Sequence, residues 1–260
     1  MHQRAEVKRQ QRLGRDAWLL RLALPAFAPP APGQFVMLRV TEGGDPLLGR
    51  AMAIYRSSRR GRGATVDVVY RVVGRGTALL AAAAPGRKLW VLGPLGGAFR
   101  LPPAGGRAVL VGGGTGIASL HLLGQALRRR RVIERVALIG ARTKTELLCR
   151  QDFRALGARV RVSTDDGTAG LRGTVTDLLE KTLGGAVRPP DAAYVCGPTP
   201  MMESAWRVCE RAGIPCQVSL EGPMACGFGV CLGCAVPCRV ADPSAPVLSP
   251  RDHMKLICTD

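Results

Sequence analysis

Short, mainly apolar segments broken by glycine and proline fill the first hundred residues of the chain. Only residues 77–84 in this part have the composition of a helix. Strands of this length, separated by turn residues at short intervals, predict an antiparallel β-barrel or sandwich. The predicted strands cover residues 18–24, 34–40, 51–55, 65–73 and 88–91.

The pattern changes after residues 101–106, a segment with paired prolines and paired glycines that is typical of a linker. Short buried strands then alternate with helical stretches. This alternation predicts a parallel sheet with helices on both faces. The predicted strands cover residues 108–111, 136–140, 159–164 and 193–196, and the predicted helices cover residues 117–130, 146–156, 175–182 and 201–212.

The length of 260 residues allows two domains of ordinary size and a small appendage. The changes in pattern divide the chain into a β-rich domain at residues 1–103, an α/β domain at residues 104–217 and a small cysteine-bearing domain at residues 218–260.

The N-terminal segment has basic residues followed by the apolar residues 19–24, an order that resembles a signal peptide. Arg21 and Pro25 interrupt the apolar stretch, so we interpret the segment as a first strand. The sequence contains no uninterrupted apolar run of about 18 residues, which argues against a membrane span. We therefore expect a cytoplasmic protein.

A formal net charge of +18 raises the question of nucleic-acid binding. The basic residues are nearly all arginine and are spread along the chain. The two arginine clusters, at residues 56–62 and 128–131, lack the interleaved aromatic residues that stack on bases. The charge therefore favours anionic cofactors and a solvated surface over nucleic acid.

Three cysteines in one glycine-rich segment, Cys226, Cys231 and Cys234, have the spacing C-x4-C-x2-C. This spacing favours a [2Fe-2S] cluster with a fourth, remote thiolate, for which Cys258 is preferred over Cys238. A zinc site is the weaker alternative, because no second cysteine or histidine pair of matching spacing follows. Four other cysteines, in apolar surroundings, have the character of small buried residues: Cys149, Cys196, Cys209 and Cys216.

A glycine turn, Gly112 to Gly116, stands between a predicted strand and a predicted helix. Such a turn places main-chain N–H groups and a helix N-terminus where a pyrophosphate binds. The motif is incomplete as a dinucleotide fingerprint, and many α/β folds need a tight turn here, so alone it is weak evidence.

The chain is similar in many separate places to one family. The matching segments, in order, are PGQFVMLRV, GRAMAIY, VYRVVGRGT, GPLGGAF, VGGGTGIASL, IGARTKTELL, STDDGTAGLRGTVTDLL, YVCGPTPMM and LEGPMACGFGVCLGC. On these segments the chain resembles the electron-transfer subunits of dihydroorotate dehydrogenase B, which are iron-sulfur flavoproteins of the ferredoxin reductase superfamily.

The resemblance implies an N-terminal FAD-binding β-barrel, a central NAD-binding domain with a parallel sheet, and a C-terminal [2Fe-2S] domain. It implies that FAD contacts Arg50, Ala51, Met52, Ala53, Val69, Tyr70, Arg71, Gly76 and Thr77; that NAD contacts Gly112, Gly113, Gly114, Thr115, Gly116, Cys196, Gly197 and Pro198; and that Cys226, Cys231, Cys234 and Cys258 hold the cluster.

Two features of the sequence bear on these expectations. Ala51 and Ala53 stand where the family has proline and serine, so a hydroxyl that contacts the flavin is absent. Arg142 and Lys144 follow the second strand of the α/β domain, where basic residues are able to bind the 2′-phosphate of NADPH. The resemblance points to NAD.

The function implied by the resemblance is electron transfer in pyrimidine (UMP) biosynthesis. Electrons would pass from the FMN of a separate catalytic subunit, through the cluster and FAD, to NAD+, in a heterotetramer with two copies of each chain. We assign no residue of this chain a catalytic role in dihydroorotate oxidation.

Two alternatives stay open. One is a reductase subunit of a related NAD(P)H-ferredoxin or sulfide oxidoreductase, although aspartate can replace the first cysteine there and Cys226 is present here. The other is a non-catalytic cluster- or zinc-binding redox module.

Overall fold

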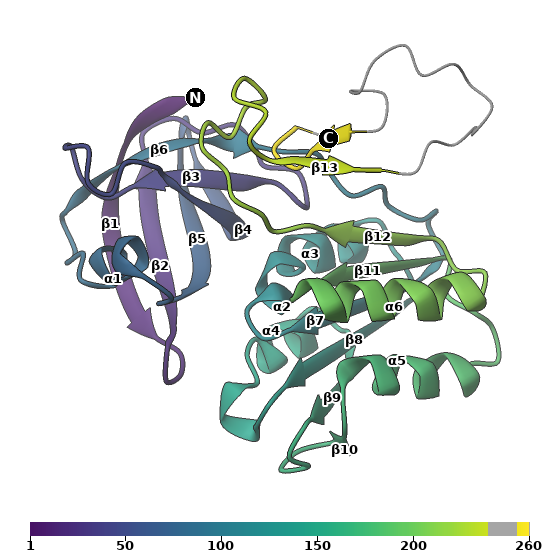
Figure 1. The fold of residues 1–260 in the computed structure, drawn as a ribbon. Coiled ribbons are helices and arrows are strands. Elements are labelled where there is room, and N and C mark those ends of the chain that lie inside the picture. The colour runs from purple at the N-terminus through teal and green to yellow at the C-terminus, as the bar shows by residue number, and fades with distance from the viewer. Residues whose placement is uncertain (239–253, 260) are drawn as a thin grey trace.

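The computed structural model describes residues 1–238 and 254–259. The N-terminal part is a closed antiparallel barrel with the strand order β1-β2-β5-β4-β3-β6 (Figure 1). The prediction of an antiparallel barrel is thereby confirmed. Its elements are β1 (His2–Arg12), β2 (Ala17–Leu24), β3 (Phe35–Arg39), β4 (Arg50–Arg60), β5 (Gly63–Arg71), β6 (Lys88–Leu95) and the helix α1 (Arg75–Ala81) between β5 and β6.

Alternation along the strands decides which side chains fill the barrel. On β4, Met52 and Ile54 are buried in the barrel core, while Ala51 and Ala53 point to the other face. The first strand, β1, is absent from the sequence prediction. Ala5 and Val7 are the apolar residues that it buries, and charged or amide side chains surround them, so the strand carries a weak hydrophobic signal.

The central part is a parallel sheet with the order β10-β9-β8-β7-β11-β12, as the alternation of strands and helices predicts. Helices α2, α3 and α4 cover one face and α5 and α6 the other (Figure 1). The strands are β7 (Arg107–Gly113), β8 (Glu134–Ala141), β9 (Arg159–Thr164), β10 (Leu171–Arg172), β11 (Ala192–Cys196) and β12 (Cys216–Ser219).

Two predicted helices are interrupted in the structure. The first is divided at Leu120, and the second begins as a 3-10 turn and restarts after Cys149, whose φ of 57° is left-handed. Within residues 1–238 and 254–259, no helix has the length and apolar character that a membrane crossing requires. The helical elements are α2 (Gly116–Ser119), α3 (His121–Arg129), η1 (Lys144–Glu146), α4 (Arg150–Ala155), α5 (Val175–Gly184) and α6 (Thr199–Arg211).

The described C-terminal part is a loop and a small hairpin, β13 (Ala235–Pro237) with β14 (Met254–Leu256). It packs on the barrel, because Cys234 and Cys258 lie in one apolar cluster with Phe35 and Met37 of β3. Residues 239–253 and 260 of the predicted cluster domain lie outside the described residues. The boundaries at residues 103/104 and 217/218 stay predictions.

The barrel and the α/β part share apolar contacts. Leu122 of α3 packs into the barrel core, and Leu19, Tyr55 and Val69 of the barrel pack against α2 and α3. His121, which is 2% exposed, contacts the carbonyl oxygen of Tyr55 through Nδ1 at 3.1 Å. The two parts are therefore held in a fixed relation.

Polar contacts surround this apolar junction. Arg56 of β4 forms an ion pair with Asp152 of α4, and its guanidinium lies over the Tyr55 ring at 4.6 Å from the centroid. Burial, and then the positive charge of Arg56, lower the pKa of His121 to about 4. The imidazole is therefore neutral at physiological pH.

We predict that His121 makes the junction sensitive to acid. Its pKa is lower when folded than the unfolded value of about 6.5, so the unfolded state binds the proton first. The contribution of the neutral His121 to the free energy of unfolding is therefore fully present above about pH 6.5, and it is lost as the pH falls toward 4. In His121→Gln, which keeps an N–H donor, the thermal midpoint should fall less steeply across this range.

The matched control is His2→Gln at the exposed ring that stacks on Trp90. Its slope of thermal midpoint against pH should equal that of the unmodified chain. Equal slopes for His121→Gln and the unmodified chain would contradict the role given to His121.

Candidate functional site

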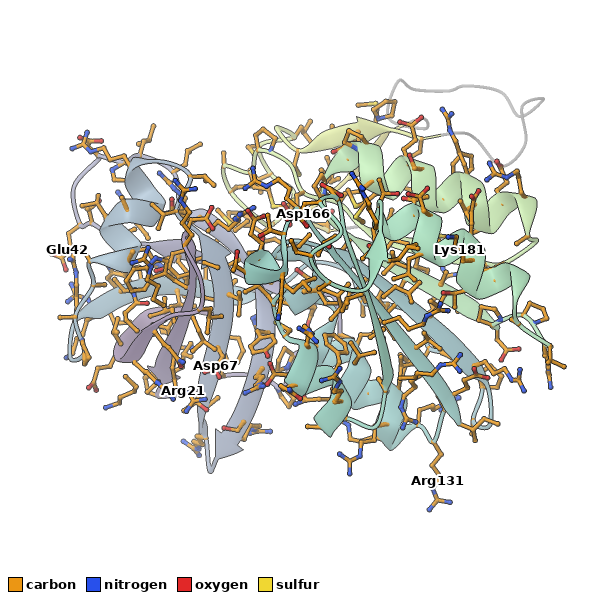
Figure 2. The ribbon with its side chains drawn as sticks, turned by 90° about the horizontal axis from the view of Figure 1, so that it is seen from below. Arg21, Glu42, Asp67, Arg131, Asp166 and Lys181 are labelled. Carbon is orange, nitrogen blue, oxygen red and sulfur yellow. The ribbon has the colours of Figure 1, made fainter. Side chains whose placement is uncertain are left out.

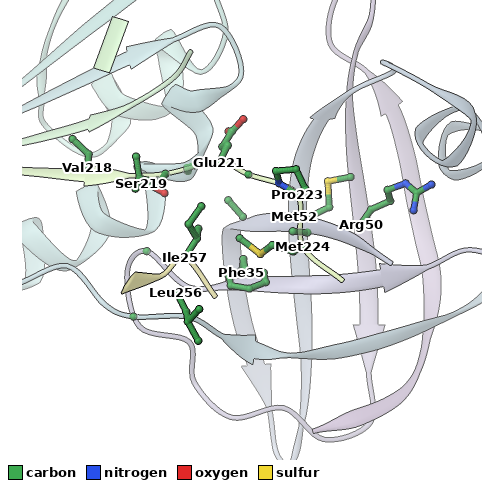
Figure 3. A pocket seen from close by; sticks show the side chains of 18 of the residues that line it. Phe35, Arg50, Met52, Val218, Ser219, Glu221, Pro223, Met224, Leu256 and Ile257 are labelled. Atoms are coloured by element: carbon green, nitrogen blue, oxygen red, sulfur yellow. The ribbon is translucent and has the colours of Figure 1, made fainter. Parts of the chain in front are cut away.

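A cavity of about 1630 Å³ lies where the barrel, the α/β part and the C-terminal hairpin meet. Figure 3 shows Arg50 and Met52 on the barrel side, Ser219 and Glu221 on the side of the sheet, and Ile257 from the C-terminal part. Its volume is sufficient for a large cofactor, since ordinary ligand pockets have about 300–1,000 Å³. The predicted site residues that line it are Arg50, Ala51, Met52, Ala53, Val69, Tyr70, Arg71, Thr77 and Thr115.

Arg50 lies directly against Gly76, although the two are distant in sequence. A Cβ atom at residue 76 would overlap the guanidinium of Arg50. Arg50 also donates through Nη1 to the carbonyl oxygens of Leu48 and Gly49, which directs the side chain across the start of α1. Glycine at residue 76 therefore lets the guanidinium lie beside the first turn of the helix.

Thr77 uses its hydroxyl within the turn that precedes α1. Its Oγ1 accepts hydrogen bonds from the N–H groups of Val73 at 2.9 Å and Gly74 at 3.1 Å, and donates to the Gly74 carbonyl at 2.9 Å. The side chain therefore fixes the turn. First-turn N–H groups of a helix have no intrahelical acceptor, and they provide the donors for an anion.

Two of the three predicted site residues on β5, Tyr70 and Arg71, lie in different surroundings. Tyr70 is 3% exposed, packs in the barrel core and lies with its hydroxyl 3.4 Å from Gln10 Oε1. Arg71 points toward the α/β part, with Nε 3.0 Å from Asp16 and Nη2 3.8 Å from Glu146.

The glycine turn and the Cys-Gly-Pro segment meet at the carboxyl ends of the neighbouring strands β7 and β11. A Cβ at Gly116 would overlap the Cys196 carbonyl, and one at Gly113 would lie 3.2 Å from Pro198 Cδ. The strand order reverses direction between β7 and β11. Crevices at such a switch point bind nucleotides in open α/β sheets.

Sequence reasoning missed three polar residues beside Cys196. The Cys196 thiol is fully buried, hydrogen bonds with Ser119 and Ser219, and has a pKa raised to about 11 by burial and then by Glu221. Burial also raises the pKa of Glu221, which lines the cavity with both serines. The signal available in the sequence was Ser-Leu-Glu, which begins at Ser219, the last residue of β12.

Of the two basic residues considered for a 2′-phosphate, Arg142 has an acidic partner in the structure. Arg142 forms a two-point ion pair with Glu146, with Nε–Oε2 at 3.1 Å and Nη2–Oε1 at 2.8 Å. Glu146 also faces Arg71. The carboxylate therefore neutralises part of the charge that would attract a second phosphate at Arg142.

The cysteine loop has a backbone that directs N–H groups at sulfur. Gly227 and Gly229 have φ of 83° and 87°, in the left-handed region that favours glycine. Burial raises the pKa of Cys226, but hydrogen bonds from the N–H groups of Cys231 and Phe228 and the thiol of Cys231 outweigh it. The pKa of Cys226 falls to about 6, so this sulfur is largely thiolate at neutral pH.

The four predicted cluster ligands lie as two pairs. Cys226 hydrogen bonds with Cys231, and the Cys234 and Cys258 sulfurs are 3.2 Å apart because β13 and β14 bring the C-terminal segment beside the loop. Within the described residues, no three or more His, Cys, Asp or Glu side chains surround a single ion position. Two pairs of cysteine sulfurs match the two protein ligands that each iron of a two-iron cluster takes.

The structure also separates the two candidates for the fourth ligand. Cys258 is 1% exposed and adjoins Cys234, whereas Cys238 is exposed and its sulfur lies 3.8 Å from the Val236 carbonyl. Cys258 therefore fits the donor set better than Cys238. Its assignment as a ligand stays a prediction.

Comparison with known proteins places the chain among oxidoreductases. Residues 110–207 match the oxidoreductase NAD-binding domain family. The dihydroorotate dehydrogenase B (NAD(+)) electron transfer subunit of Desulforamulus reducens is 41% identical over 205 residues, covering 79% of this chain and 76% of the relative. The subunit of the same name from Lysinibacillus sphaericus is 34% identical and covers 99% of this chain and 94% of the relative.

Solved structures agree on the fold. A chain of the NADH-dependent reduced ferredoxin-NADP oxidoreductase superposes with a TM-score of 0.83 at 28% identity, covering 98% of this chain and 86% of that chain. The similarity extends over the barrel, the sheet and the C-terminal part together.

We predict that Gly116→Ala destabilises the α/β part more than Gly113→Ala does. At Gly116 the new methyl group would strike the main chain of β11, which is held in the sheet, whereas at Gly113 it would meet the flexible Met201 side chain, 2.5 Å from its sulfur. We expect a loss of about 1–3 kcal/mol for Gly116→Ala and less than about 1 kcal/mol for Gly113→Ala.

Thermal unfolding followed by circular dichroism measures the difference, with Gly43→Ala as the control because a Cβ there meets no atom within 4 Å. Equal midpoints for the Gly116 and Gly113 variants would refute the packing argument.

Proposed function

Because the chain belongs to the family of dihydroorotate dehydrogenase B electron transfer subunits, we propose that it carries electrons from a dihydroorotate-oxidising partner subunit to NAD+. The carriers on this chain are a [2Fe-2S] cluster and FAD, and the reaction serves pyrimidine (UMP) biosynthesis. The observation that carries the proposal is that one cavity, of about 1630 Å³, borders the barrel, the sheet and the cysteine-bearing part together.

The FAD site in this proposal is the barrel side of the cavity. Arg50, beside the first turn of α1, supplies a positive charge for the pyrophosphate, and the N–H groups of Gly76 and Thr77 supply hydrogen bonds. Ala51, Met52, Ala53, Val69 and Tyr70 supply the wall of β4 and β5 against which the cofactor packs, with Arg71 at its end.

The nicotinamide nucleotide is proposed to lie at the carboxyl ends of β7 and β11. Residues 112–116 bring main-chain N–H groups to its phosphates, while Cys196, Gly197 and Pro198 lie at the nicotinamide end. The ion pair between Arg142 and Glu146 supports NAD over NADP, since it neutralises part of the charge of Arg142.

The cluster is proposed to be held by Cys226 and Cys231 on one iron and Cys234 and Cys258 on the other. FAD exchanges both single electrons and hydride, whereas the cluster exchanges one electron and nicotinamide a pair, so this set of cofactors links one-electron to two-electron chemistry. The packing of the cysteine loop on β3 supports a short distance between cluster and flavin.

The proposed partner is an FMN-containing catalytic subunit, in a heterotetramer with two copies of each chain. Phe228 and Val230 on the cysteine loop are 53% and 73% exposed. Exposed apolar side chains beside an electron carrier support a partner contact at this loop. The proposed location is the cytoplasm, and the proposed domains are residues 1–103, 104–217 and 218–260.

A reductase subunit of an NAD(P)H-ferredoxin oxidoreductase is the second candidate. It is supported by the superposition on the NADH-dependent reduced ferredoxin-NADP oxidoreductase at 28% identity. The higher identity to dihydroorotate dehydrogenase B subunits, at 41%, and the presence of Cys226 favour the first proposal.

We predict that Arg50→Ala lowers the affinity for FAD by about one to two powers of ten, because a charge-assisted contact contributes about 1.5–3 kcal/mol. Gly76→Ala should also lower the affinity for FAD, because the new methyl group displaces the Arg50 guanidinium without removing it. Fluorescence titration of the flavin-free chain with FAD measures both.

Gly74→Ala is the matched control, because φ is −177° there and a Cβ meets no atom within 4 Å. It should bind FAD as the unmodified chain does. Unchanged affinity in Arg50→Ala would show that the pyrophosphate lies elsewhere.

We predict that serine at residue 226, 231, 234 or 258 removes the cluster absorbance and leaves the flavin bound. Reduction of FAD by NADH should continue, because the NAD and FAD sites do not use these thiols. With the FMN-containing subunit and dihydroorotate added, NAD+ reduction should be lost. Cys238→Ser is the control and should retain both the cluster and the coupled reaction.

A full complement of iron in Cys258→Ser together with its loss in Cys238→Ser would reverse the assignment of the fourth ligand. A colourless protein that binds one zinc ion and no flavin would reject the whole electron-transfer proposal. Coupling to a ferredoxin but not to dihydroorotate oxidation would favour the second candidate.

A further inference from the structure

A second cavity, of about 620 Å³, opens at the opposite edge of the parallel sheet from the cofactor cavity. It is formed by the amino ends of β7, β8 and β9, the last turn of α5 and the loop that follows α5. Figure 2 shows Lys181 on α5, on the side of the molecule away from the barrel. Its volume lies within the range of small-molecule sites.

The polar lining of this cavity is strongly basic. Five positively charged side chains and one carboxylate face it. The carboxylate of Glu134 lies between two arginines, 3.4 Å from Arg107 and 3.6 Å from Arg159. The nearby Asp191 accepts the main-chain N–H of Arg107 at 2.7 Å. The basic residues are Arg107, Arg159, Arg161, Lys181 and Arg188.

The sheet places these charges on one face. Arg159 and Arg161 are two residues apart on β9, so their side chains leave the strand on the same side. Arg161 donates through Nη1 to the Thr182 hydroxyl at 2.9 Å, and that hydroxyl donates to the Leu178 carbonyl at 2.6 Å. The end of α5 therefore holds the Arg161 guanidinium in place.

The floor of the cavity is apolar. Val109 and Val136, from the core under α5, and the partly buried Leu183 line it. A ring of guanidinium and ammonium groups over an apolar floor suits an anion that also has an uncharged part. None of the described residues that line the cavity is aromatic, so they offer no ring on which a strand of nucleic acid would stack.

The negative end of the α5 dipole accounts for a lysine near its last turn. It does not account for three arginines that come from two strands. These arginines converge on one hollow, where Glu134 is the one carboxylate among the described lining residues, and this convergence is the observation that points to a ligand.

We propose that this cavity binds a small polyphosphate-bearing anion, such as a nucleoside triphosphate or inorganic polyphosphate. Arg107, Arg159 and Arg161 bind the phosphate oxygens from the strand side, with bidentate contacts that suit guanidinium groups. Lys181 closes the site from α5. The site lies at the amino edge of the sheet, so its occupant does not compete with NAD at the carboxyl edge.

The first experiment is calorimetric titration of the full chain, carrying its native cofactors and saturated with NAD+, with sodium tripolyphosphate at fixed ionic strength. We expect one binding site. Arg159→Gln/Arg161→Gln should weaken binding by at least about tenfold, since two charge-assisted contacts are lost.

Arg129→Gln/Arg130→Gln is the matched control, because it removes the same charge from the exposed end of α3 and the loop after it. It should change the affinity by less than about twofold, since long-range surface charge is screened by salt. NADH oxidation with an artificial acceptor should be the same in both double variants, which checks that each is folded.

Absence of binding in the unmodified chain would overturn the proposal, as would equal weakening in the two double variants. Titration with ATP distinguishes the source of the phosphates. If ATP binds more tightly than tripolyphosphate, the ligand of this cavity is a nucleotide whose base contacts the apolar floor. If ATP binds more weakly, the ligand is inorganic polyphosphate.

Discussion

The apolar junction between the barrel and the α/β part is the contact on which the rest of the structure depends. Leu122 enters the barrel core, Tyr55 and Val69 pack against α2 and α3, and the neutral His121 is sealed between them. The ion pair of Arg56 and Asp152 borders this contact. Because the walls of the large cavity come from both parts, their fixed relation sets its width and shape.

Close approach of main chain is the second recurring constraint. At Gly76 a Cβ would overlap a guanidinium, at Gly116 a carbonyl of the neighbouring strand, and at Gly227 it would lie 2.8 Å from Met37. These glycines stand at the proposed flavin, nicotinamide and cluster sites respectively. Because glycine has no Cβ, each of these positions lets a charged group or a strand approach the main chain more closely than any other residue would permit. The geometry of each site therefore depends on glycine at that position.

The arginines of this chain lie in different surroundings and make different contacts. Arg50 and Arg71 face the large cavity, Arg142 is neutralised by Glu146, and Arg56 holds the junction. The net charge of +18 therefore leaves most of its excess on the surface, as the scattered arginines suggested. The amino edge of the sheet is an exception, because several arginines converge there on one hollow.

The sequence alone determined the alternation of short strands, the later strand-helix order and the cysteine spacing, since each depends on residues close in the chain. It missed β1, whose few apolar residues give little periodicity. It also predicted two continuous helices that the structure divides, the first at Leu120 and the second at Cys149. Tertiary structure alone decided the contact of Arg50 with Gly76, the grouping of Glu221 with Cys196, and the position of Cys258 beside Cys234. These pairs are distant in sequence, and only strand pairing and domain packing bring them together.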